Sequence, residues 1–116
     1  MLSLRALSLC CALALLPGVT QAHAHLLHAV PADGAVLRAA PARVVLTFSE
    51  PARLAVLWVA PENGARRRIA SLPVEAAPEI SVPLPPLSPG RYTLTWRVIG
   101  SDGHVVPGEL RFTVSE

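Results

Sequence analysis

Apolar and polar residues alternate along two long stretches of the chain, residues 91–99 and residues 109–115. In each stretch every second residue is apolar, and most of the residues between are polar or charged. Successive side chains of a β-strand point to opposite faces of a sheet, so this period of two predicts half-buried strands. Shorter apolar or alternating segments indicate five more strands, at residues 26–30, 44–49, 54–60, 67–72 and 79–84.

The pattern nowhere has the 3.6-residue period of an amphipathic helix. About seven short strands, about 8 to 12 residues apart, predict an all-β domain, an antiparallel sandwich or barrel of the immunoglobulin-like kind. The 12 prolines support this class, because proline ends strands and protects sheet edges. The Asn63-Gly64 pair, which follows the strand expected at 54–60, is typical of a hairpin turn.

The first 22 residues are expected to be a cleaved secretory signal peptide. They contain a lone Arg5, an apolar run over residues 6–16 and a helix-breaking Pro-Gly pair at 17–18. The run is shorter than the ~20 residues of a membrane helix and no other segment comes closer, so we expect no membrane insertion. Small residues allow cleavage before His23 or before His25.

Cleavage would leave residues 23–116 as a single small domain without cysteine. Such a domain has no disulfide, no thiolate ligand for a metal and no thiol nucleophile. The full chain has 10 basic residues, all arginine, and 8 acidic ones, and a balance so near neutral argues against a nucleic-acid partner. The one basic run, Arg66-Arg67-Arg68, is expected to be a solvated strand edge.

Four histidines carry the candidate chemistry, and His23, His25 and His28 cluster at the expected cleavage point. A histidine that begins a mature chain offers its α-amine and its imidazole together as a chelating pair. The fourth, His104, follows Asp102 in the loop between the two clearest strands, and residues two apart in an extended segment face the same side. An amine, imidazoles and a carboxylate form a nitrogen and oxygen set suited to tetragonal Cu(II).

Two other interpretations of these residues stay open. Histidines near a terminus, or after an Asp-Gly turn, are often only solvated. Alternatively, with His25 as the third mature residue, the α-amine, two backbone amides and the His25 imidazole would wrap Cu(II) in a square plane, an arrangement we term the local clamp. Ladder hydrogen bonds of the Ala24 and His25 amides in a first strand would oppose it.

Six segments of the mature chain follow one another in a recognisable order. They are HAHL at 23–26, PADG at 31–34, LTFSE at 46–50, GRYTLTW at 90–96, SDGH at 101–104 and GELRF at 108–112. Together they resemble the landmarks of CopC/YobA-like periplasmic copper-binding proteins, over essentially the whole mature chain. The resemblance implies a small Greek-key β-barrel or sandwich, immunoglobulin-like or cupredoxin-like, and a mature chain that begins at His23.

The resemblance also implies one Cu(II) site per chain, near the mature N-terminus. Its ligands would be the α-amine and imidazole of His23, the imidazole of His104 and the carboxylate of Asp102. Glu50 matches an acidic position near the metal in some members, although a charged residue that ends a strand before a proline explains it as well. His25 is an auxiliary candidate.

The implied function is that of a non-enzymatic copper carrier or buffer in copper homeostasis or resistance, a monomer that hands copper to a CopD-like inner-membrane transporter. Some members bind Cu(I) through methionines, but the one methionine here is Met1, so no site of that type is expected. The alternatives are a histidine-brace copper oxidase, for which few aromatic residues remain to bind a substrate, and a metal-free immunoglobulin-like module.

Overall fold

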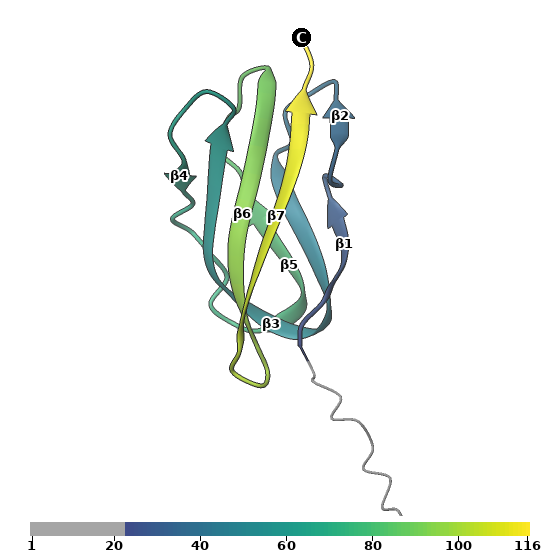
Figure 1. The fold of residues 1–116 in the computed structure, drawn as a ribbon, viewed down its shortest axis with the longest axis vertical. Helices are drawn as coiled ribbons and strands as arrows, with labels where there is room; N and C mark the ends of the chain where they lie inside the picture. The colour runs from purple at the N-terminus through teal and green to yellow at the C-terminus, as the bar shows by residue number, and fades with distance from the viewer. Residues whose placement is uncertain (1–22) are drawn as a thin grey trace, which may run out of the picture.

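The computed structural model describes residues 23–116, and the expected signal peptide, residues 1–22, lies outside the described residues. The described chain forms seven strands in one curled sheet (Figure 1). They are β1 (Leu26–Val30), β2 (Ala35–Leu37), β3 (Arg43–Pro61), β4 (Arg67–Arg68), β5 (Ala77–Pro83), β6 (Gly90–Gly100) and β7 (Val105–Val114). No helix of these residues has the length and apolar character that a membrane crossing needs.

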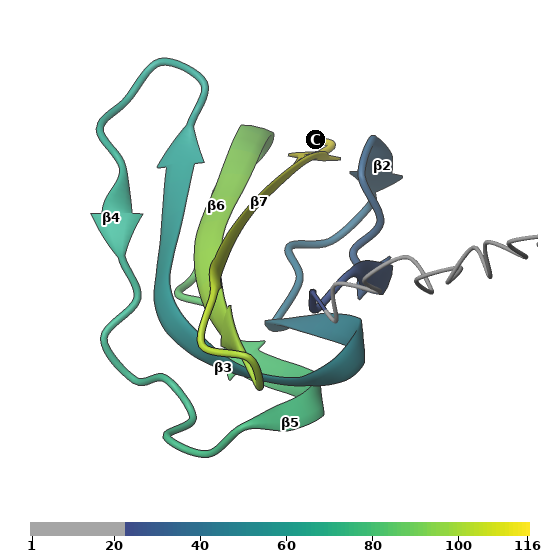
Figure 2. The same cartoon turned by 60° about the horizontal axis from the view of Figure 1, so that its bottom comes forward.

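The long strand β3 bends near its centre and joins two layers of the domain (Figure 2). The residues up to Phe48 pair with β1 and β5, and those from Ala52 onward pair mainly with β6 and β4. Beyond β3, the second layer continues through β6 and β7 to β2. A strand that passes from one layer to the other at a bend is a common way to make the corner of a β-sandwich.

The sequence predicted two strands, 44–49 and 54–60, where the structure has the single strand β3, and this division was wrong. Ala52 pairs both with Ala77 of β5 and with Gly100 of β6, so pairing continues through the corner. Pro51 has no N–H to donate, but it stands at the bend, where proline does not interrupt a ladder. The Glu50-Pro51 pair is therefore a bend within a strand and not a loop between two.

Strand β2 was not predicted, and it forms the one parallel pair among the described strands, with β7. Three residues are too few to display a period of two. The strand is held instead by bonds to distant residues: Gly34 N–H donates to Arg111 O at 2.7 Å, and Ser115 N–H donates to Leu37 O at 2.8 Å. The all-β, immunoglobulin-like class is confirmed, with a mixed sheet in place of a wholly antiparallel one.

The other strand predictions are confirmed in position. β1 has the predicted bounds, and β5, β6 and β7 begin earlier than predicted. β4 is limited to Arg67–Arg68, within the basic run, and pairs only with β3, which makes it an edge strand as expected. The predicted turn lies between β3 and β4, where Gly64 N–H donates to Pro61 O at 3.2 Å.

The core lies between the two layers and contains large apolar side chains: Trp96, Phe112, Leu46, Leu57, Leu94 and Leu110. Trp96, an apolar residue of the alternating stretch 91–99, is 2% exposed. It pairs with Gly108 of β7, where a Cβ atom would stand 2.2 Å from the indole ring, so only glycine fits there. The tightly paired β6 and β7 carry the loop 101–104 at one end of the domain (Figure 1).

Candidate metal centre

The loop 101–104 is a tight turn closed by the ends of β6 and β7. Gly100 N–H donates to His104 O, and Gly103 N–H donates to Gly100 O, both at 3.0 Å. Gly103 has φ of 84°, a left-handed conformation that glycine adopts at little cost. The turn therefore holds Asp102 and His104 together at the end of a rigid hairpin.

Asp102 contacts His104 through both of its carboxylate oxygens. Oδ1 accepts the His104 N–H at 3.0 Å, and Oδ2 lies 2.8 Å from His104 Nδ1, which donates when it carries the ring proton. The side-chain bond first, then the backbone bond, lowers the pKa of the Asp102 carboxyl, and the nearby imidazoles of His104 and His23 lower that pKa further. Asp102 is therefore ionised at neutral pH, the form that binds a metal ion.

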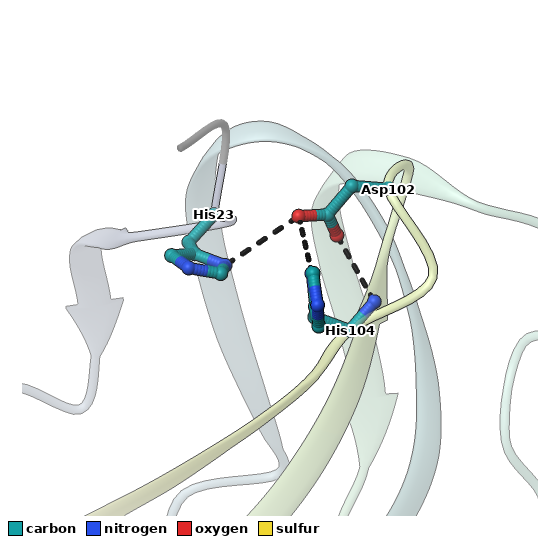
Figure 3. A group of neighbouring side chains, drawn as sticks. All are labelled: His23, Asp102 and His104. Carbon is teal, nitrogen blue, oxygen red and sulfur yellow. Dashed lines mark hydrogen bonds and ion pairs between the residues drawn. The ribbon is translucent and has the colours of Figure 1, made fainter. Parts of the chain in front are cut away.

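His23 approaches the same carboxylate from the N-terminal segment. Its Nδ1 lies 3.5 Å from Asp102 Oδ2, and the ring centroids of His23 and His104 are 5.2 Å apart (Figure 3). The side chain of His23 is 31% exposed and that of His104 is 67% exposed. The group is thus partly open to solvent.

Ser49, in the bend of β3, fixes the path of the chain that brings His23 to this loop. The His25 N–H donates to Ser49 Oγ at 2.9 Å, and this hydroxyl donates to the His23 carbonyl oxygen at 3.4 Å. Ser49 N–H in turn donates to the His25 carbonyl oxygen at 2.8 Å. Ala24, between the two histidines, is fully buried. The segment is therefore anchored on both sides of Ala24.

Asp102 and the two histidines meet as a group of ligand-type side chains. One ligand atom from each of His23, Asp102 and His104 lies within 4.8 Å of the other two, and within residues 23–116 this is the one group of three or more such residues. Two imidazole nitrogens and a carboxylate oxygen are suitable donors for Cu(II). The sequence predicted these three residues as ligands, and the structure brings them together; that a metal binds there stays a prediction.

Glu50 and His25, the two lesser candidates, border this group without joining it. Glu50 Oε1 accepts the Ser101 Oγ–H at 3.1 Å, which ties the loop 101–104 to the bend of β3. The His25 ring centroid lies 6.5 Å from that of His23, and His25 is exposed. The His25 amide is engaged as expected, but with a serine hydroxyl in place of a ladder carbonyl.

Sequence reasoning missed the two serines that support the group. Ser49 and Ser101 lie within the LTFSE and SDGH segments, but nothing in a segment tells which distant group its serine will contact. Ser49 is 24 positions from His25 along the chain, and Ser101 is 51 positions from Glu50. Only the folded chain brings these partners together.

The fold and this group define a small all-β domain whose candidate metal centre lies where the N-terminal segment meets the β6–β7 loop. The model of the CopC domain family matches residues 26–115. The chain belongs to the CopC family, and the resemblance drawn from the six sequence segments is thereby confirmed.

Relatives match the domain over most of their own length. The chain is 36% identical to Protein YobA of Escherichia coli (strain K12) over an alignment of 98 positions, and the alignment covers 80% of this chain and 79% of YobA. It is 32% identical to Copper resistance protein C of Pseudomonas syringae pv. tomato over an alignment of 116 positions, and the alignment covers 86% of each chain. The crystal structure of CopC from Methylosinus trichosporium OB3b matches with a TM-score of 0.71 and 29% identity, over 80% of this chain and 94% of that one.

Proposed function

We propose that this protein binds copper in copper resistance or homeostasis and holds one Cu(II) at the group formed by His23, Asp102 and His104. The observation that carries the proposal is the approach of these three side chains to within 4.8 Å, from the N-terminal segment and from the loop between β6 and β7. Relatives that include Copper resistance protein C support copper as the metal. Among divalent first-row metals, copper also has the highest affinity for nitrogen and oxygen sites.

The α-amine of His23 is the proposed fourth ligand. Cleavage before His23 would free this amine on the residue whose ring lies 3.5 Å from Asp102. An amine and an imidazole on one residue form a chelate, so the processed chain would offer three nitrogens and one oxygen. In the precursor the same nitrogen belongs to a peptide bond, so export to the periplasm and signal cleavage would complete the site.

The role of a carrier or buffer fits the protein better than that of a histidine-brace oxidase, because no Phe, Tyr or Trp side chain of the described residues is left exposed to form a binding surface for a substrate. Four of the five are buried in the core: Phe48, Tyr92, Trp96 and Phe112. The fifth, Trp58, is half-buried and lies under Arg66, whose guanidinium carbon stands 4.2 Å from the centroid of the indole ring. Sustained oxygen consumption by the copper-loaded protein with a reductant would overturn the carrier function.

The proposed recipient of the copper is a CopD-like inner-membrane transporter, as the family resemblance implies. The His104 side chain is 67% exposed, so a recipient would reach the ion directly. All of the proposed ligands come from one chain, which is consistent with a monomer that acts alone. The sequence has no methionine after Met1, so we propose no thioether site for Cu(I).

Titration with Cu(II) of the exported protein, after mass spectrometry has located its first residue, tests the proposal. One equivalent should quench the fluorescence of Trp96, because Cu(II) is paramagnetic. His104→Ala should weaken binding at least about tenfold, the scale on which metal sites respond to loss of a supporting group. His28→Ala, at an exposed histidine of β1, is the matched control and should leave the affinity unchanged.

A second comparison isolates the α-amine. A chain with one extra residue before His23 keeps all the side chains but displaces the amine, and we expect it to bind Cu(II) far more weakly. Equal affinity of the two chains would contradict the chelate. Absence of Cu(II) binding by a chain that begins at His23 would favour the metal-free immunoglobulin-like module.

A further inference from the structure

Ser49 holds the N-terminal segment by three hydrogen bonds to two of its residues. The hydroxyl accepts the His25 N–H at 2.9 Å and donates to the His23 carbonyl oxygen at 3.4 Å. The backbone N–H of Ser49 donates to the His25 carbonyl oxygen at 2.8 Å. The hydroxyl alone contacts the His25 amide, so this contact depends on the identity of the side chain at position 49.

The His25 amide is also the group on which two modes of copper binding differ. In the site that His23 shares with Asp102 and His104, which we term the shared site, the His25 amide keeps its hydrogen and does not bind copper. In the local clamp, copper takes the place of the hydrogens on the Ala24 and His25 amides, and the His25 imidazole completes the square. The bond from the His25 N–H to Ser49 stabilises the shared site, because the clamp would break that bond and leave its acceptor without the donor.

Ala24 supports the same preference. Its side chain is fully buried and belongs to the core cluster. A clamp that wraps the Ala24 amide around copper would have to draw the methyl group away from the core. One methyl group is a weak anchor, so the hydrogen bonds of Ser49 are needed to keep the segment in place.

We propose that Ser49 is a positioning residue that directs the N-terminal segment to the shared site and withholds the His25 amide from the local clamp. The inference rests on the proposed Cu(II) site and deepens it, because it names the residue that selects which ligands the copper takes. Ser49 acts through the backbone of residues 23 and 25. Its role therefore concerns the mode of binding and not the presence of a ligand.

The test compares the wild-type protein with Ser49→Ala and Ser49→Thr, each exported and shown by mass to begin at His23, with and without His104→Ala. The measured quantities are Cu(II) affinity and, at one equivalent, the visible d–d absorption and the EPR spectrum. Ser71→Ala, at an exposed serine outside the strands, is the matched control. Ser49 is exposed, so its alanine variant should fold, and thermal unfolding verifies this.

In the wild type, His104→Ala should weaken Cu(II) binding at least about tenfold. In the Ser49→Ala background we expect His104→Ala to weaken Cu(II) binding by about twofold or less, because copper held in the local clamp does not use His104. The effects of the two substitutions are then not additive. The d–d absorption band of copper-loaded Ser49→Ala should lie at shorter wavelength than that of the wild type, since amide nitrogens are stronger-field ligands than carboxylate oxygens. Ser49→Thr keeps the hydroxyl and should behave as the wild type, and Ser71→Ala should do the same.

Hydrogen exchange gives a readout that needs no metal. In the metal-free protein, the His25 amide should exchange about fivefold faster in Ser49→Ala than in the wild type, because the loss of one hydrogen bond shifts an opening equilibrium by roughly that factor. Ser49→Thr should retain the protection. Equal exchange in Ser49→Ala and in the wild type would contradict the proposed contact.

The outcomes separate this inference from the proposed function. If Ser49→Ala keeps the wild-type spectra and the full effect of His104→Ala, the role of Ser49 is overturned while the copper site stands. If the wild type itself has the spectrum of the clamp and does not respond to His104→Ala, the proposed site is overturned. A third outcome is that Ser49→Ala loses Cu(II) binding without gaining the spectrum of the local clamp, in which copper has four nitrogen ligands. That result would overturn the selection that we assign to Ser49.

Discussion

Asp102 is the residue at which the two halves of the candidate metal centre meet. Its Oδ2 faces both imidazoles, 3.5 Å from His23 Nδ1 and 2.8 Å from His104 Nδ1. The hydrogen bonds from His104 lower the pKa of the carboxyl, so a negative charge is present at neutral pH. Without metal this charge attracts the two rings, and with metal the carboxylate would be a ligand or would orient one.

Asp102→Asn keeps the size of the side chain and removes its charge. We expect the Cu(II) affinity to fall about tenfold or more, measured by competition with a chelator of known affinity. Glu75→Gln is the control, since Glu75 is exposed and forms no ion pair with any residue of the described chain. An unchanged affinity in Asp102→Asn would contradict a role for the carboxylate in the site.

Variants of Glu50 and Ser101 distinguish a ligand from a support. Glu50 accepts the Ser101 hydroxyl at 3.1 Å, and glutamine at position 50 would keep an acceptor oxygen. We therefore expect Glu50→Gln to retain the Cu(II) affinity within about twofold, and Glu50→Ala and Ser101→Ala each to lower it by up to about tenfold. If Glu50 bound the metal directly, Glu50→Gln would be as damaging as Glu50→Ala, and Ser101→Ala would have no effect.

At the scale of elements, the ladder between β6 and β7 supports the loop of the candidate site. Gly108→Ala would place a Cβ atom 2.2 Å from the Trp96 ring, which is buried and has little room to move. We expect a loss of about 1–3 kcal/mol in the free energy of unfolding, measured by chemical denaturation. Trp96→Phe replaces the indole by a smaller ring, so Gly108→Ala should lower the free energy of unfolding by less in that background. If the losses from the two substitutions simply add, the steric cause is contradicted.

Some elements were predictable from sequence because the evidence lies within the element itself. β6 and β7 are long enough to repeat the alternation several times, and β1 was predicted with its bounds. The bend of β3 was mistaken for a loop, since Glu50-Pro51 is typical of a strand end and only the double pairing of Ala52 identifies a corner. β2 depends on hydrogen bonds to β7 and its flanks, and its three residues carry no pattern of their own.

At the scale of the whole molecule, copper would join the N-terminal segment to the loop between β6 and β7. A ligand that binds only the folded state stabilises it by RT ln(1 + [L]/Kd), about 4 kcal/mol at a free concentration a thousand times Kd. We expect saturating Cu(II) to raise the midpoint of thermal unfolding by at least several degrees in calorimetry. A chain extended by one residue before His23 should gain less, and an equal gain would contradict the α-amine as a ligand.

The sequence by itself determined the all-β class, the near-neutral, cysteine-free composition of residues 23–116, the family, and the three residues expected to bind copper. The tertiary structure decided which candidates meet: His23 joins Asp102 and His104, Glu50 supports the loop, and Ser49 holds the N-terminal segment. The physical reason is the separation along the chain of the residues that each property involves. Alternation and ligand types are local properties that a short segment displays, whereas these contacts link distant positions and depend on strand register and on the bend of β3.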